Sequence, residues 1–109
     1  MDQQTIINDL RTLGIGRQYI GYHVTIQAVQ MVLEDENRLL SIKQGVLVPL
    51  SEEQQCEWRT VERNIRTIIH RAWTVNRPYM SELAGYPMQQ EPTVTEFLEI
   101  LSAHLLRQK

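Results

Sequence analysis

The chain has 109 residues, of which 42% are hydrophobic and 22% are charged. These ordinary values exclude a disordered chain, which combines low hydrophobicity with a high net charge. Eleven basic and thirteen acidic residues give a net charge of −2, which excludes a uniformly basic coat protein for nucleic acid. The length predicts a single domain, residues 1–109.

The sequence predicts a cytoplasmic protein with no membrane segment. One cysteine, Cys56, cannot form an internal disulfide or a cysteine-based metal site. Residues 1–5 have neither the positive charge nor the apolar core of a signal peptide. The longest apolar run, residues 46–50, contains Pro49 and is far too short to cross a bilayer.

Apolar residues recur at helical spacing along the chain, and no alternating strand pattern persists. The fold class predicted is therefore all-α, a compact bundle of about six helices containing a helix-turn-helix. Gly14 and Gly85 end the first and fifth helices, and Pro49 breaks the third because proline lacks a donor and clashes with the preceding turn. The predicted helices lie near residues 3–13, 20–34, 38–48, 57–75, 79–84 and 94–107.

Two capping boxes and one turn are predicted between these helices. Residues 51–54 read Ser-x-x-Gln, and residues 93–96 read Thr-x-x-Glu. Residues 51–74 contain no glycine or proline, so one continuous helix competes with two helices joined by a turn. A continuous helix would lose its amphipathic pattern before Trp58, which favours a turn at residues 55–57.

The helix at residues 57–75 has one apolar side and one basic side. Its apolar side is expected to be mostly buried against Ile26, Val29 and Leu33, and comprises Trp58, Val61, Ile65, Ile69 and Trp73. Five arginines and two glutamates give residues 57–77 a net charge of +3, whereas six basic and eleven acidic residues give the remainder −5. At about 100° per residue, the opposite side carries a row of three guanidinium groups and one imidazole: Arg59, Arg63, Arg66 and His70.

This row fits either a solvated surface or a DNA recognition helix. Thr60 and Thr67 flank the row, and Glu62 lies at its edge. Arginine can bind guanine O6 and N7 with two hydrogen bonds, and glutamate can accept from cytosine N4. Arginine contacts to phosphate add affinity without sequence information.

The residues that carry chemistry in enzymes show no catalytic arrangement. His23, His70 and His104 are widely separated, and none forms a metal-ligand pair. No glycine-rich phosphate loop is present, and Cys56 is expected to be a small half-buried residue at a turn. We therefore predict no enzymatic activity, no catalytic residue, no metal and no cofactor.

The run from Thr60 to Arg66, continued by Ala72-Trp73, resembles the recognition helix of the sporulation initiation factor, the stage zero response regulator of endospore-forming bacteria. The resemblance is to its C-terminal DNA-binding effector domain, and it covers nearly the whole chain. Further matches are Gly21-Tyr22, Ala28, Met31-Val32, Ser41-Ile42, Gly85-Tyr86, Pro92-Thr93 and Glu96-Phe97. The resemblance implies a six-helix domain that reads a short DNA box, with two copies able to bind adjacent boxes.

The chain also departs from this family. The family's recognition helix reads Arg-Val-Glu-Arg, and Thr60 stands in the place of the first arginine. Arg59 is displaced by about 100° and does not substitute for it. The family's lysine-containing loop before the last helix is shorter here and reads Pro-Met-Gln-Gln-Glu at residues 87–91. No receiver domain is found in the sequence, so phosphorylation is not expected to regulate this chain in cis.

Together the residues and the resemblance predict sequence-specific binding of duplex DNA by a transcription regulator. The predicted DNA-binding residues are Arg59, Thr60, Glu62, Arg63, Arg66, Thr67 and His70. The partners expected are duplex DNA and either a second copy on an adjacent box or a full-length regulator. The alternative is a protein-interaction module of the same fold, with degraded DNA reading, that modulates a full-length regulator.

Overall fold

The computed structural model describes residues 3–107, and every regular element in that range is a helix. The all-α prediction is therefore confirmed for the described part of the chain. The α-helices are α1 (Gln3–Thr12), α2 (Tyr22–Glu34), α3 (Val48–Gln54), α4 (Trp58–Val75), α5 (Arg77–Ala84) and α6 (Val94–Arg107). A 3-10 helix, η1 (Glu36–Leu40), and a π-helical turn, η2 (Lys43–Leu47), connect α2 to α3.

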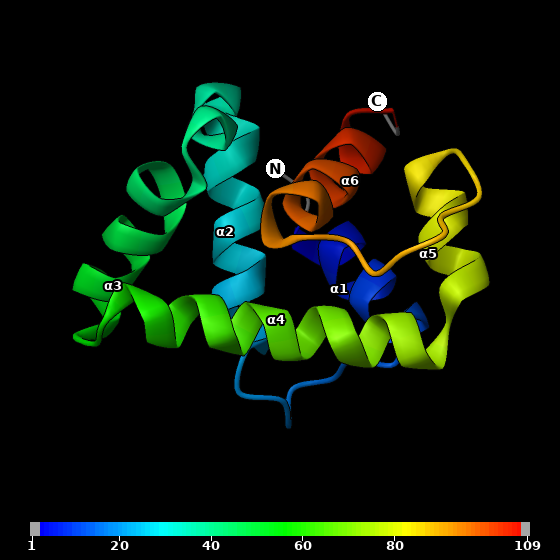
Figure 1. The fold of residues 1–109 in the computed structure, drawn as a ribbon, viewed down its shortest axis with the longest axis horizontal. Coiled ribbons are helices and arrows are strands. Elements are labelled where there is room, and N and C mark those ends of the chain that lie inside the picture. Colours follow the sequence, from blue (N-terminus) through cyan, green and yellow to red (C-terminus); the bar gives the residue numbers. More distant parts are fainter. Residues whose placement is uncertain (1–2, 108–109) are drawn as a thin grey trace.

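Helix α4 runs along one edge of the molecule, with α3 at its first end and α5 at its last end (Figure 1). Helices α2 and α6 pack against each other behind it, and both contact α4. The core lies between these elements and includes the fully buried Phe97 of α6, Leu10 of α1 and Ile65 of α4. One side of α4 is thus fixed to the core and the other faces outward.

The start of α2 lies directly against the middle of α4. A Cβ atom added at Gly21 would lie 2.4 Å from the carbonyl oxygen of Asn64 and 2.7 Å from Cγ1 of Ile68. Only a residue without a side chain allows the two backbones to approach this closely. Gly21 therefore helps to set the position of α4 on the bundle.

The prediction of a third helix near residues 38–48 that Pro49 breaks is wrong: residues 36–40 form a 3-10 helix, residues 43–47 a π-helical turn, and α3 spans residues 48–54. The helical backbone continues through Pro49, because the π-helical turn η2 leads without interruption into α3. The N–H of Val48 donates to the carbonyl of Lys43, five residues back. This wider turn accommodates a proline, which has no N–H to donate and clashes with a regular preceding turn.

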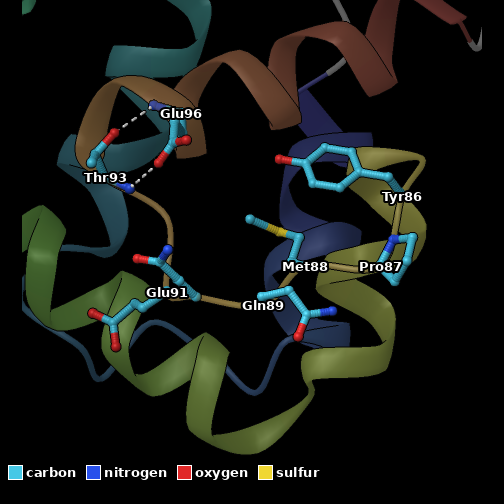
Figure 2. Close-up of a pocket in the computed structure, with 8 residues that line it drawn as sticks. Tyr86, Pro87, Met88, Gln89, Glu91, Thr93 and Glu96 are labelled. Carbon is cyan, nitrogen blue, oxygen red and sulfur yellow. Dashed lines mark hydrogen bonds between the residues drawn. The ribbon is translucent and has the colours of Figure 1, made fainter.

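The capping boxes have opposite outcomes. Ser51 is not a cap: it is buried inside α3, and its Oγ donates to the carbonyl of Val48 at 2.7 Å. Thr93 and Glu96 do form the predicted box at the start of α6 (Figure 2). There the Thr93 N–H donates to Oε1 of Glu96 at 2.8 Å, and the Glu96 N–H donates to Oγ1 of Thr93 at 3.1 Å.

A polar cluster that the sequence did not indicate joins α1, α5 and α6. The carboxylate of Asp9 is buried, and its Oδ1 accepts from the Tyr79 hydroxyl at 2.8 Å. Its Oδ2 lies 2.7 Å from Nδ1 of His104. Burial, together with the hydrogen bond to Asp9, raises the pKa of Tyr79 to about 12. The phenol therefore remains a donor throughout the neutral pH range.

Candidate nucleic-acid interface

The turn predicted at residues 55–57 is confirmed. Gln55 has φ 57° and ψ 46°, the left-handed conformation that ends a helix. The Cys56 N–H donates to the carbonyl of Ser51 at 2.9 Å, and the Gln55 N–H donates to the carbonyl of Glu52 at 3.3 Å. These two bonds are the pair that closes a Schellman motif. Helices α3 and α4 are therefore separate and form a helix-turn-helix.

The surroundings of this turn differ in two details from the sequence predictions. Cys56 is exposed rather than half-buried. Trp58, predicted to be mostly buried, is only partly buried and packs at the margin of the core. Leu33 of α2, one of the residues expected to pack against α4, is also partly buried. The other predicted residues on the apolar side of α4 are buried as expected, namely Val61, Ile65, Ile69 and Trp73.

The structure brings all seven predicted DNA-binding residues together on α4. We call this set the arginine face: Arg59, Thr60, Glu62, Arg63, Arg66, Thr67 and His70. Thr60 and Glu62 are partly buried at its border, and the other five residues are exposed. The buried side of the same helix holds the face outward from the bundle.

The central part of the arginine face is only loosely bound to the protein itself. Nη2 of Arg66 lies 3.7 Å from Oε2 of Glu62, and the Arg66 side chain is 69% exposed. Such exposed pairs contribute little to stability. Within residues 3–107, Arg63 forms no ion pair and its side chain forms no hydrogen bond. Its guanidinium is therefore available to a ligand.

At the first end of α4, two cations lie beside the indole ring of Trp58. Nζ of Lys43, in η2, lies 4.6 Å from the centre of the ring, and Cζ of Arg59 lies 4.9 Å from it. Both distances are in the range of cation–π contacts. Sequence analysis missed Lys43, because nothing in the spacing of residues 43 and 58 indicates that they meet.

At the other end of α4, one basic residue faces an acidic side chain and two arginines lie over aromatic rings. Nδ1 of His70 lies 2.9 Å from Oε1 of Glu91, in the loop between α5 and α6. Arg71 lies over the ring of Tyr19 at 5.7 Å, and Arg77 lies over the ring of Trp73 at 4.7 Å. Figure 2 shows Glu91 in the loop that leads to the start of α6.

Other kinds of site receive no support in the part of the chain that the structure describes. Among residues 3–107, no group of histidine, cysteine, aspartate and glutamate side chains is arranged to hold a metal ion. No described helix is both long and apolar enough to cross a membrane. The loop 86–91 borders a hollow of about 310 Å³, which is open to solvent and lined by Tyr86, Met88, Glu91 and Glu96 among others (Figure 2).

Comparison with known protein families gives a match over almost the whole chain. The family model described as "Sporulation initiation factor Spo0A C terminal" matches residues 6–105. The matched range runs from the first turns of α1 to near the end of α6, and it includes the helix-turn-helix and the complete arginine face. This family is one of DNA-binding domains of transcription factors and not a family of enzymes. The chain belongs to the family of Spo0A C-terminal domains and is a DNA-binding domain of the sporulation-initiation type.

Proposed function

We propose that this chain binds duplex DNA sequence-specifically, as a transcription regulator, by placing the first half of α4 in the major groove. The observation that carries the proposal is the arginine face, which projects from a helix held by a helix-turn-helix and leaves Arg63 unengaged. The major groove is about 12 Å wide and admits one helix. Residues near the start of a recognition helix are the ones that meet base edges.

The roles of the face follow from chemistry and position. Arg63 donates to guanine O6 and N7, and Glu62 accepts from cytosine N4. Arg59 and Arg66 contact phosphates, which contributes affinity for every sequence. Thr60, Thr67 and His70 border these contacts. Arg66 also reduces the repulsion between phosphate and Glu62, whose carboxylate it already faces at 3.7 Å.

The proposal extends to the assembly. Residues 1–109 act as one domain, and two copies occupy adjacent boxes or one copy pairs with a full-length regulator. A protein that regulates a bacterial chromosome in this way works in the cytoplasm, where we place it.

Glu62→Ala tests base reading most sharply, because it removes a negative charge. A generic electrostatic binder gains affinity for all duplexes when repulsion from phosphate is relieved. A base reader instead loses discrimination at one position, because cytosine N4 loses its acceptor. The measurement is the ratio of affinities for duplexes with and without the family's box, at two salt concentrations. Glu99→Ala, an exposed glutamate of α6, is the control for the charge change alone.

A second candidate function is a protein-interaction module that modulates a full-length regulator. Two observations favour it: Thr60 replaces the family's first recognition arginine, and Glu91 places a carboxylate against His70 on the face itself. Under this function, duplex binding is weak and independent of sequence. An unchanged site preference in Glu62→Ala would make this function the leading one.

A further inference from the structure

Trp58 brings together charges from two different elements of the helix-turn-helix. Lys43 belongs to the π-helical turn that leads into α3, and Arg59 belongs to the first turn of α4. Both side chains are exposed, and both charges lie within 5 Å of the centre of one indole ring. The negative faces of the ring attract both cations, and so the ring holds two flexible side chains in the same neighbourhood.

The two charges are close and not neutralised. Since each lies within 5 Å of one point, they are at most about 10 Å apart, which is about the distance over which exposed charges still act on each other in 0.1 M salt. Neither forms an ion pair with any other residue in the described range 3–107. A place where two like charges are held together without a counterion is one that an anion stabilises.

The neighbouring backbone favours the same kind of ligand. No side chain caps the start of α4, so the peptide N–H groups of its first turn are not satisfied by a side chain at this end. These groups carry the positive end of the helix dipole. In helix-turn-helix proteins, the helix before the recognition helix crosses the DNA backbone. Lys43 lies on the segment that leads into that helix.

We propose that Lys43 and Arg59, positioned by Trp58, form a clamp for the backbone phosphates of duplex DNA beside the first end of α4. The inference rests on the proposed function and adds to it a contact outside α4, Lys43. Trp58 acts as a positioning residue: it holds the two cations and does not itself read bases. The clamp contributes affinity and fixes the register of α4, without changing which sequence is preferred.

Lys43→Gln tests the clamp by removing one charge while keeping a polar side chain. Loss of one phosphate contact lowers the slope of log affinity against log salt by about one unit. The advantage of the natural chain over the variant should therefore shrink about threefold to fourfold between 50 and 200 mM salt. The affinity ratio for duplexes with and without the box should stay the same.

Arg77→Gln is the matched control. Arg77 also lies over a tryptophan, Trp73, and loses the same charge, but it stands beyond the last end of α4 and brings no second cation to its ring. Its salt slope should not change. Equal slopes for Lys43→Gln and the natural chain would overturn the clamp, and so would equal losses of slope in Lys43→Gln and Arg77→Gln.

Trp58→Phe and Trp58→Leu separate positioning from packing. Phenylalanine keeps an aromatic face for the cations, whereas leucine keeps only an apolar side chain. We expect Trp58→Phe to retain most of the affinity for DNA and Trp58→Leu to lose it by severalfold, at equal fractions of folded protein measured by circular dichroism. Equal affinities of the two variants would show that the ring does not position the cations.

The design distinguishes this inference from the proposed function. If the natural chain prefers the box and Arg63→Ala relaxes that preference, the proposed function holds regardless of Lys43. In that case, a salt slope of Lys43→Gln equal to that of the natural chain would refute the clamp and leave the proposed function standing. If the natural chain does not bind duplex DNA at all, both fail.

Discussion

The two ends of α4 carry similar charges but stand in different surroundings. Near the first end, the Arg63 side chain forms no ion pair or hydrogen bond among the described residues, and Arg59 shares the Trp58 ring with Lys43. Near the last end, His70 faces Glu91, and Arg77 lies over Trp73 alone. A count of basic residues along the helix does not reveal this difference. It teaches that an acidic side chain from another element, such as Glu91, changes the surroundings of a basic helix in a way that the sequence of the helix does not show.

The largest effect is expected from a substitution in the middle of α4, where packing against the core supports both ends of the helix. Ile65 is fully buried in the middle of α4, so Ile65→Ala removes apolar contacts and leaves a cavity. The free energy of unfolding should fall by about 2–5 kcal/mol. Urea denaturation measures it. Leu40→Ala, at a side chain 86% exposed, should change it by less than about 0.5 kcal/mol. A comparable loss of unfolding free energy in both variants would mean that α4 does not pack against the core as the structure shows.

Substituting an arginine near the first end of α4 should affect DNA binding differently from substituting one near the last end. Arg63→Ala should cost about 1–3 kcal/mol of binding free energy on the preferred duplex and relax its specificity, because a contact to a base is lost. Arg71→Ala removes the same charge from a side chain that lies over Tyr19, and it should leave site preference unchanged. Titration of both variants with duplexes that differ at single positions measures this. If both variants lost the same amount of site preference, the two ends of α4 would not differ in base reading.

Glu91→Lys makes the last end resemble the first. The substitution removes the carboxylate that lies 2.9 Å from His70 and adds a cation to the loop. If the loop lies near the DNA backbone, affinity should rise for all sequences alike, and the salt slope should steepen by about one unit. Glu36→Lys, in the exposed η1, is the control for net charge. Matching slopes in the two variants would place the loop away from DNA.

The smallest effect is expected at the turn that separates α3 from the first end of α4. Gln55 adopts a left-handed conformation that glycine adopts at no steric cost. Gln55→Gly should therefore raise the free energy of unfolding by up to about 1 kcal/mol, and DNA preference should not change. Thermal unfolding checks the first part. Gln54→Gly, one residue earlier inside α3, should instead destabilise the domain by about 0.5–1 kcal/mol.

Local sequence determined the helices other than α3, the capping box of Thr93 and Glu96, and the basic side of α4. Helical period and side-chain capping depend on residues three or four positions apart, so the sequence pattern contains them directly. The turn at Gln55 followed from the same logic, because an uninterrupted helix would have lost its apolar side before Trp58. The resemblance to the sporulation initiation factor rested on an ordered set of such local matches. The match of the family model to residues 6–105 confirms it.

Tertiary structure alone decided how these elements meet. The helical backbone continues through Pro49 because of a π-helical turn that the residue pattern did not indicate. The pairs Lys43–Trp58, His70–Glu91 and Asp9–His104 join residues on different elements, and their contact depends on the angles at which those elements pack. Spacing along the chain does not encode those angles. The chain thus determined which side of α4 is basic, and the packing around α4 determined which side chains of other elements lie against its basic residues.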